Sequence, residues 1–248
     1  MGDDTNKFTL GNKRVLVAIP AYNEETTVAK VIADVKGSIP NLDVLVIDDG
    51  SDDNTAVAAK LAGAHTLTLP FNVGVGGAMR TAFLYAKQNQ YDSVVQVDAD
   101  GQHDPAQLPV LLKGLESASV VVGSRFASGS SYSVHGPRKW AMVLLSTYLS
   151  HTVGTELNDT TSGFRAADKK AIDLFAKHYP SEYLGDTVES LVIAKRHGLQ
   201  IIQVPVTMRE RQGGQPSQGG FKSTLYLTRA ILAMVVALTR KRVTGGAP

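Results

Sequence analysis

Short apolar runs alternate with longer helical stripes along the first half of the chain. A short apolar run bounded by polar turns predicts a buried strand, and a stripe of helical period predicts a helix with one apolar face. The predicted strands are Val15–Ile19, Val44–Ile47, Thr66–Leu69, Ser93–Val97 and Val120–Val122. The predicted helices carry the stripes Val28–Val35, Thr55–Leu61, Met79–Ala86 and Leu108–Leu115. This alternation predicts an α/β fold, a mostly parallel sheet flanked by helices, with ligands bound beyond the carboxyl ends of the strands.

The second half of the chain has a less regular pattern. The elements predicted there are helices near 139–150, 169–177 and 187–197, a strand at Ile201–Val206, a Gly-, Gln- and Ser-rich loop at Gln212–Gly220, and a last helix over about 223–240. We expect one Rossmann-like domain over residues 13–225, with a nucleotide-binding half and an acceptor half. Residues 1–12 are expected to form a flexible end, and residues 226–248 an apolar or amphipathic helix with a basic tail.

The composition narrows the class of protein. Of the 248 residues, 43% are hydrophobic and 19% are charged, which is typical of a globular chain with enough apolar residues for one large domain. The net charge of +2 is too small to indicate a nucleic-acid partner by itself. The absence of cysteine excludes disulfides, thiolate metal sites and cysteine nucleophiles, and it fits a reducing compartment.

The sequence contains no candidate membrane span. No run approaches the roughly 20 apolar residues that a spanning helix needs, and the polar stretch Met1–Lys13 has no signal-peptide core. A cytoplasmic location is therefore expected. The longest apolar run, Ala230–Leu238, is flanked by Arg229 and by basic residues 240–242. It is either a core helix with a solvated basic end or a helix lying on the inner face of the membrane, where its cations meet anionic headgroups.

The clearest candidate chemistry follows the predicted strand Ser93–Val97. Asp98 and Asp100 come directly after it, and side chains two apart in an extended segment point the same way. Two such carboxylates can hold a hard cation, Mg²⁺ or Mn²⁺, together with substrate phosphates. Gln102 and His103 follow closely and could complete the shell. The alternative interpretation is a solvated acidic turn.

Two further polar clusters follow predicted strands. Asp48 and Asp49 could accept hydrogen bonds from a base or a ribose, or this turn could simply cap the helix that begins near Asn54. After the first strand, Tyr22 could stack on a nucleobase, whereas Glu24 could equally be a first-turn helix residue. Because parallel strands end at one edge of a sheet, these acidic clusters are expected to lie together.

Cations are spread around these clusters. Arginine recognises phosphates through paired hydrogen bonds, so several arginines near one site suit a substrate that carries a diphosphate. Each of them alone is more often a surface residue. The candidates are Arg125, Arg138, Lys139, Arg165, Arg209, Arg211 and Lys222.

Six motifs occur in a fixed order within residues 14–225. They are Val17–Glu24, Val46–Thr55, Asn72–Gly74, Gln96–His103, Gly123–Arg125 and Thr161–Arg165. In this order they resemble the family 2 glycosyltransferases, and within that family the dolichyl- or polyprenyl-phosphate sugar synthases.

The resemblance implies a GT-A fold and an inverting, metal-dependent transfer of a sugar. The donor would be a nucleoside diphosphate sugar, GDP-mannose or a UDP-sugar, and the acceptor a polyprenyl or dolichyl phosphate. By this resemblance the residues that hold the nucleoside are Pro20, Tyr22, Glu24 and Asp49, with Asp48 a weaker candidate. Those that bind the metal and the diphosphate are Asp98, Asp100 and Gln102. Those that contact phosphate groups are Arg125 and Arg138. The basic residues of a later loop would close over the donor, and these are Arg209, Arg211 and Lys222.

A sugar hydroxyl of a polysaccharide or glycolipid is the alternative acceptor. An acceptor phosphate is already anionic near neutral pH and needs no general base, whereas a hydroxyl needs one. Asp186 and Glu189, three apart on a predicted helix, would then be candidates for the base, or else acidic first-turn residues. A nucleotidyltransferase would need a Gly-rich basic loop where this chain has Pro20–Glu24, and a non-catalytic binding module would not need the acidic pair.

Overall fold

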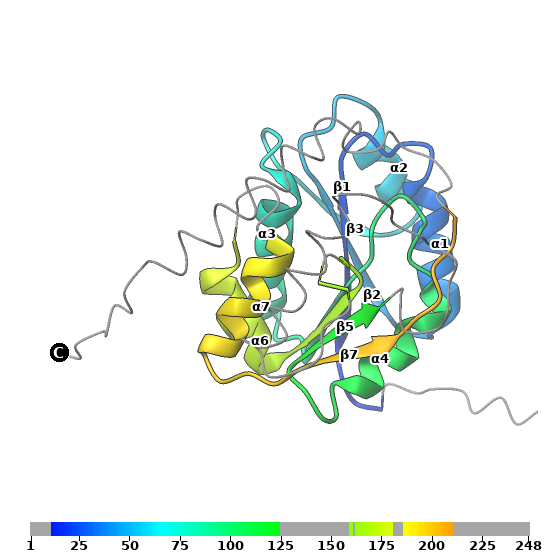
Figure 1. Cartoon of the computed structure of the whole chain (residues 1–248). Helices are drawn as coiled ribbons and strands as arrows, with labels where there is room; N and C mark the ends of the chain where they lie inside the picture. The colour runs from blue at the N-terminus through cyan, green and yellow to red at the C-terminus, as the bar shows by residue number, and fades with distance from the viewer. Residues whose placement is uncertain (1–10, 125–158, 161, 181–185, 211–248) are drawn as a thin grey trace, which may run out of the picture.

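A seven-stranded sheet forms the centre of the protein in the computed structural model, which describes residues 11–124, 159–160, 162–180 and 186–210 (Figure 1). Its strands are β1 (Val15–Ala21), β2 (Asp43–Asp48), β3 (His65–Thr68), β4 (Ser93–Gln96), β5 (Val120–Ser124), β6 (Arg165–Asp168) and β7 (Ile201–Pro205). Their order across the sheet is β3-β2-β1-β4-β6-β5-β7. Only β6 among these strands runs antiparallel to its neighbours, β4 and β5. The mostly parallel sheet predicted from the sequence is confirmed.

Helices cover both faces of this sheet. Those described are α1 (Val28–Ser38), α2 (Thr55–Leu61), α3 (Gly74–Gln88), the 3-10 turn η1 (Pro105–Gln107), α4 (Leu108–Gly114), α6 (Lys169–His178) and α7 (Asp186–Arg196). Figure 1 shows α3, α6 and α7 on one side of the sheet and α1 and α4 on the other. The buried apolar side chains form two clusters that divide between the helices in the same way.

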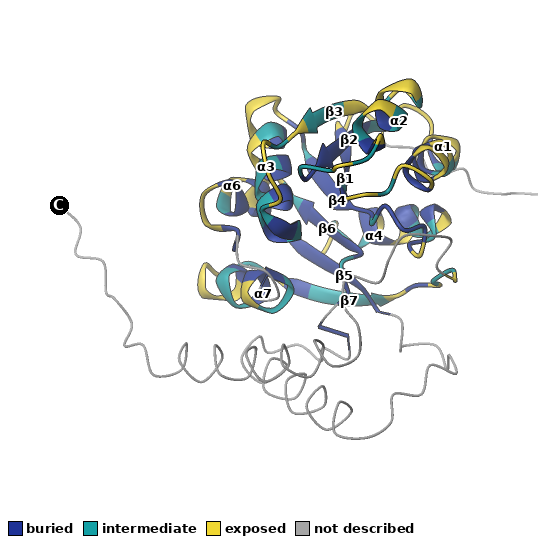
Figure 2. Ribbon diagram, turned by 90° about the horizontal axis from the view of Figure 1, so that it is seen from above, coloured by how far each residue is buried: buried dark blue, intermediate teal, exposed yellow. Residues whose placement is uncertain are grey.

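Both faces of the central strands are buried. On β1, Leu16 and Ala18 belong to the cluster that contains α3, while Val15, Val17 and Ile19 belong to the cluster that contains α1. A parallel strand covered on both faces is apolar at consecutive positions. This explains why the sequence shows continuous apolar runs. Figure 2 shows the buried strands between helices whose outer surfaces are exposed.

The sequence pattern does not predict β6. Its residues Arg165-Ala166-Ala167-Asp168 include none of the β-branched or aromatic types that favour strands. Tertiary pairing makes it a strand, because β4 and β5 bond to it on its two sides. The two alanines are buried there, and their small side chains suit a strand that has helices packed close to both faces.

The other predicted elements are confirmed where the structure describes them, with shifted ends. The helix predicted over Met79–Ala86, for example, begins at Gly74 and ends at Gln88. The predicted helices at 139–150 and 223–240, the loop at 212–220 and the basic tail lie outside the described residues. Within the described ranges no helix is long and apolar enough to cross a membrane.

Candidate active site

The polar motifs meet at the carboxyl edge of the sheet. β1 lies between β2 and β4, so successive strands are added first on one side of β1 and then on the other. Open α/β sheets bind ligands beyond the strand ends at such a switch point. Tyr22, Asp49 and Asp98 follow the ends of β1, β2 and β4. The structure therefore brings together the clusters that were expected at one edge.

The loop after β4 holds its two carboxylates differently. Asp98 has a half-buried side chain, 38% exposed, while Asp100 is buried at 7%. The Asp100 Oδ1 accepts a hydrogen bond from the backbone N–H of Gln102 at 3.0 Å. Gln102 is exposed. Asp98 thus presents an accessible carboxylate, and Asp100 is fixed by the turn it starts.

The His103 ring contacts both the backbone and the carboxylate of Asp98. Its Nδ1 accepts the backbone N–H of Asp98 at 2.9 Å, which places the ring proton on Nε2. Nε2 lies 3.5 Å from the Asp98 Oδ2, and the ring stacks on buried Phe164 with centroids 4.7 Å apart. Both ring nitrogens therefore face Asp98. This arrangement assigns His103 an orienting role, where the sequence left it as a possible metal ligand.

Gly163 keeps the space beside Asp98 open. A Cβ atom built at this glycine would lie 3.2 Å from each Asp98 carboxylate oxygen and 2.9 Å from the Gln96 Nε2. The same Gln96 Nε2 donates a hydrogen bond to the Asp98 Oδ1 at 3.1 Å. A side chain at Gly163 would displace one of these groups.

The chemistry of this loop fits a hard divalent cation. Its candidate donors are the carboxylate oxygens of Asp98 and Asp100 and the amide oxygen of Gln102, and Mg²⁺ and Mn²⁺ prefer oxygen. In the part of the chain that the structure describes, no three His, Asp or Glu side chains converge as a ready cage. Mg²⁺ is commonly held by one or two carboxylates with substrate phosphates, so the residues present fit that kind of site.

The loops after β1 and β2 are tied together by their own motif residues. The Asn23 N–H donates to the Ser51 Oγ at 2.9 Å, and its side-chain oxygen accepts the Asp52 N–H at 2.9 Å. The Glu24 N–H donates to the Thr55 Oγ1 at 2.8 Å. α1 begins only at Val28, so the first-turn interpretation of Glu24 is wrong. These contacts leave the Tyr22 side chain 44% exposed at the strand end, where a nucleobase could stack, beside half-buried Pro20.

Asp48 and Asp49 are both buried and both accept backbone hydrogen bonds. Asp48 Oδ1 accepts the Ser51 N–H at 3.1 Å. The two oxygens of Asp49 accept the N–H groups of Val73 and Gly74, each at 2.8 Å, at the start of α3. Burial raises the pKa of Asp49, and these two hydrogen bonds oppose the rise. Asp49 therefore links the end of β2 to the positive end of α3.

The turn at Gly50 requires glycine. Its φ of +71° is in the left-handed region, and a Cβ atom there would lie 2.6 Å from the backbone carbon of Phe71. The loop that carries Asp48 and Asp49 thus touches the backbone that leads into α3.

Asp186 is the first residue of α7, which lies on the same side of the sheet as α3 (Figure 1). It is 3% exposed, and its Cβ is 3.2 Å from the Cβ position of Gly76 in α3. Burial raises the pKa of Asp186, and attraction to the Arg165 guanidinium opposes the rise. Glu189, one turn further along α7, is exposed.

Arg165 is buried and bonded to the protein. Its Nε donates to the Ser162 carbonyl at 2.7 Å, one terminal nitrogen to the Thr160 carbonyl at 2.8 Å, and the other to the Thr187 carbonyl and the Ser190 Oγ at 2.6 and 3.0 Å. Burial lowers the pKa of Arg165. The interpretation of this arginine as a phosphate ligand is corrected, because its donors are bound to three backbone carbonyls and the Ser190 hydroxyl.

A known protein family matches more than half of this chain. Residues 16–175 match the model of glycosyl transferase family 2. The chain belongs to glycosyl transferase family 2. It is 36% identical over 217 residues to an undecaprenyl-phosphate mannosyltransferase of Micrococcus luteus, covering 84% of this chain and 88% of the relative. It is 32% identical over 222 residues to a polyprenol monophosphomannose synthase of Mycolicibacterium smegmatis, covering 84% and 82%.

Solved structures confirm the GT-A fold of this glycosyltransferase. Glucosyl-3-phosphoglycerate synthase from Mycobacterium tuberculosis, in complex with Mn²⁺, UDP and phosphoglyceric acid, superposes with a TM-score of 0.70 at 21% identity. The match covers 95% of this chain and 82% of that enzyme.

The remaining predicted site residues divide into two groups. Arg125, Arg138, Lys139, Arg211 and Lys222 lie outside the described residues. Arg209 is described, and its guanidinium forms ion pairs with Asp34 and Asp104, each at 2.7 Å. Each terminal nitrogen of Arg209 is therefore paired with a carboxylate.

Sequence reasoning missed several supporting residues of this glycosyltransferase. Gly163 and Asp34 carry no local signal that connects them with Asp98 and Arg209, because these partners are distant in the sequence. Gln96 is only two residues from Asp98, and a polar residue inside a buried apolar run was its signal. Asp104 has a signal: an Asp directly before Pro105 is a typical N-cap, and Asp104 does accept the Ala106 N–H.

Proposed function

We propose that this glycosyltransferase is metal-dependent and inverting, and that it transfers a sugar from a nucleoside diphosphate sugar to a polyprenyl phosphate. The observation that carries the proposal is the carboxylate pair Asp98 and Asp100 beyond β4, at the switch point of the sheet. The names of the two relatives support a polyprenyl phosphate acceptor and mannose as the sugar. The neighbour captured with Mn²⁺ and UDP supports a metal and a nucleoside diphosphate, so we propose GDP-mannose or a UDP-sugar as donor.

In this proposal the loop after β4 holds Mg²⁺ or Mn²⁺ through Asp98, Asp100 and Gln102. The cation would neutralise charge that develops on the leaving diphosphate. The protein's own part is preorganisation: His103 and Gln96 orient Asp98, and the Gln102 N–H orients Asp100. The residues proposed to hold the nucleoside are Pro20, Tyr22, Glu24, Asp48 and Asp49.

We propose that the phosphate groups of the substrates bind the cations of the later motifs, Arg125, Arg138, Arg211 and Lys222. Fixed positive groups stabilise a departing diphosphate best in a site that excludes water. Arg165 is not among them, because its donors are bound to carbonyls.

The burial of Asp186 favours a phosphate acceptor over a hydroxyl acceptor. A general base must reach the proton that it removes, but Asp186 is 3% exposed and lies close to Gly76 of α3. Glu189 is exposed and stays the candidate base for the alternative, a sugar hydroxyl of a polysaccharide or glycolipid. Labelled donor offered with undecaprenyl phosphate and, separately, with a glycolipid that has free sugar hydroxyls separates the two. Transfer to the glycolipid alone would contradict the proposal.

We also propose peripheral contact with the inner face of the cytoplasmic membrane, since a polyprenyl acceptor resides in lipid. Residues 225–242 combine an apolar run with basic flanks, a combination that binds anionic surfaces. Deleting them is expected to lower co-sedimentation with anionic vesicles and to leave nucleotide binding unchanged. Equal partitioning of the truncated and full chains would remove this part of the proposal.

The experiment that tests the donor chemistry measures thermal stabilisation by nucleoside diphosphates, with and without Mg²⁺ or Mn²⁺. Ligand at 100 times its dissociation constant adds about 2.7 kcal/mol to the free energy of unfolding, so binding raises Tm measurably. We expect a rise with GDP or UDP that needs the metal. Asp100→Ala should abolish it, while the control Asp173→Ala, on the exposed face of α6, should behave as wild type.

Three outcomes distinguish the possibilities. A metal-dependent rise that Asp100→Ala leaves intact would remove the metal assignment but keep a nucleotide site. A rise without any metal requirement would favour a metal-independent transferase. No rise with any nucleotide would point to a protein that binds its donor only with a partner.

A further inference from the structure

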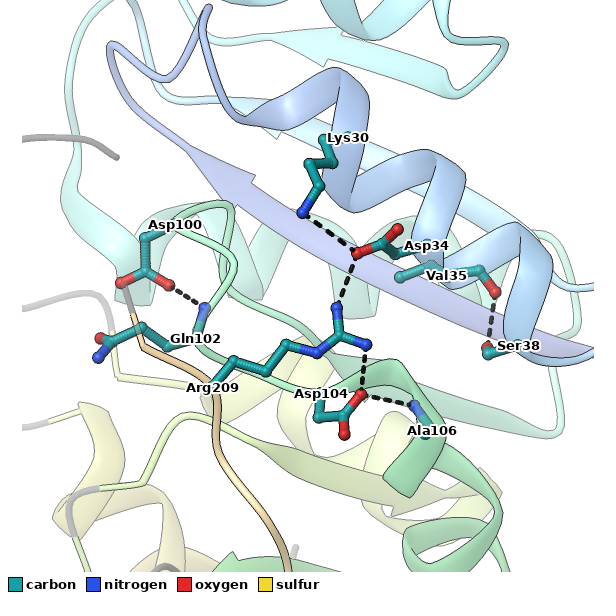
Figure 3. A network of polar contacts seen from close by, with 9 residues as sticks. All are labelled: Lys30, Asp34, Val35, Ser38, Asp100, Gln102, Asp104, Ala106 and Arg209. Atoms are coloured by element: carbon teal, nitrogen blue, oxygen red, sulfur yellow. Dashed lines mark hydrogen bonds and ion pairs between the residues drawn. The ribbon is translucent and has the colours of Figure 1, made fainter. Parts of the chain in front are cut away.

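We propose that Arg209 is a positioning residue that fixes the metal loop, residues 98–104, from the side away from the Asp100 carboxylate, and so sets the affinity of that loop for its cation. The inference rests on the proposed function, because it concerns the metal site that Asp98, Asp100 and Gln102 would form. Figure 3 shows the Arg209 side chain extending away from Asp100 toward Asp34 and Asp104.

The first contact is made by the backbone. The Arg209 N–H donates to the Gln102 carbonyl at 2.8 Å, and Met208 forms an antiparallel bridge with His103. The chain leaving β7 thus runs beside the metal loop like a short extra strand. Its hydrogen bond falls on Gln102, the residue whose N–H holds the Asp100 carboxylate.

The second contact is made by the guanidinium, which joins two carboxylates from different elements. One terminal nitrogen lies 2.7 Å from the Asp34 Oδ2 in α1, and the other lies 2.7 Å from the Asp104 Oδ1. Lys30 lies 4.0 Å from the same Asp34 oxygen (Figure 3). A planar fork of donors can serve two carboxylates at once, whereas the single ammonium of lysine acts as a point charge.

Asp104 connects this ion-pair network to the metal loop. Its Oδ1 also accepts the Ala106 N–H at 3.2 Å and so caps η1. The preceding residue is His103, whose ring accepts the Asp98 N–H. Arg209 therefore reaches Asp100 through Gln102, and Asp98 through Asp104 and His103.

The exposure of these charges indicates a role in geometry more than in stability. The side chains of Arg209, Asp34 and Asp104 are 36%, 33% and 17% exposed. Ion pairs of this exposure usually add little to the free energy of unfolding. By contrast, losing a group that orients metal ligands typically costs 10- to 100-fold in metal affinity or activity.

The test is a Mn²⁺ titration of the full chain at saturating GDP, and in parallel at saturating UDP, with bound metal followed by electron paramagnetic resonance. The variants are Arg209→Gln, which removes the charge, and Arg209→Lys, which keeps one charge but cannot bridge both carboxylates. Asp104→Asn probes the same link from its other end. The matched control is Lys87→Gln, which breaks a 2.8 Å surface ion pair between α3 and α6.

We expect both Arg209 variants and Asp104→Asn to raise the half-saturating Mn²⁺ concentration about tenfold. Tm should fall by at most about 4 °C, and turnover should recover at high Mn²⁺. The control should match wild type in Mn²⁺ affinity.

Unchanged Mn²⁺ affinity in Arg209→Gln would overturn the inference, whether or not Tm falls. A raised KM for the donor at saturating Mn²⁺, with unchanged Mn²⁺ affinity, would overturn it in favour of direct contact with the donor. Absence of Mn²⁺ binding to the wild-type protein with both nucleotides would overturn the proposed metal dependence itself, and the inference with it.

Discussion

The two halves of the site hold their loops by opposite chemistry. In the donor half, at the ends of β2 and β4, carboxylates accept backbone N–H groups: Asp48 from Ser51, Asp49 from the start of α3, and Asp100 from Gln102. In the other half, a buried cation donates to backbone carbonyls, since Arg165 binds the segment before β6 and the first turn of α7.

The difference follows from which backbone groups each half leaves unpaired. Turns that lead into helices expose N–H groups, and a carboxylate satisfies them. The segment around Thr160 and Ser162 presents carbonyls, and only a donor with several N–H groups can satisfy these from one position. The Thr187 carbonyl, in the first turn of α7, accepts a hydrogen bond from the Arg165 guanidinium in addition to one from the Ser190 hydroxyl. The donor half therefore distributes its support over several residues, whereas the other half concentrates it in one.

The largest expected effect comes from Arg165→Met, which removes the one side chain that bonds both the segment before β6 and the first turn of α7. We expect the free energy of unfolding to fall by about 3–5 kcal/mol, since removing one partner of a buried charged network leaves the others unsatisfied. Arg165→Lys should recover only part of this, because one ammonium cannot reach all four acceptors. Chemical denaturation measures both. A loss below about 1 kcal/mol for Arg165→Met would show that support is shared in this half too.

A smaller effect is expected for Asp49→Asn in the donor half. The amide oxygen can still accept one backbone N–H, but the amide nitrogen then faces the other, and a buried donor without an acceptor costs about 1–3 kcal/mol. The same denaturation measurement, with exposed Asp52→Asn as control, tests this. A loss as large as that of Arg165→Met would erase the contrast between the halves.

The smallest effect is expected at the amino ends of β2 and β4, away from the site. This position serves as a reference for both halves of the site. The Tyr91 hydroxyl donates to the Asp43 Oδ2 at 2.9 Å, and Tyr91→Phe should lower the free energy of unfolding by about 1 kcal/mol. Burial, followed by the hydrogen bond to Asp43, raises the pKa of Tyr91 from 10.0 to about 12.

This raised pKa fixes the sign of the pH dependence. The folded protein keeps the Tyr91 proton longer than the unfolded chain does, so this stability is fully present below pH 10 and is lost as the pH rises through about 12. Tm of wild type should therefore fall faster than that of Tyr91→Phe above pH 10. Parallel curves for the two proteins would contradict this assignment.

Much of the donor half could be predicted from the sequence because its signals are local. Asp98 directly follows a buried apolar run. Asp48 and Asp49 precede Gly50, whose φ of +71° is the left-handed conformation that this turn needs. The placement of Tyr22, Asp49 and Asp98 at one edge followed from strand polarity alone. Periodicity and turn chemistry extend over a few residues, which is the range that a sequence pattern records.

The sequence by itself determined the α/β class, the strands whose ends carry the acidic motifs, and membership of a glycosyltransferase family. Only the tertiary structure decided that Arg-Ala-Ala-Asp becomes strand β6, that Arg165 faces carbonyls, that His103 orients Asp98, and that Arg209 pairs with Asp34, 175 positions away. The physical reason is that a charged side chain takes its role from the groups that surround it after folding. The sequence records its charge and reach but not those partners.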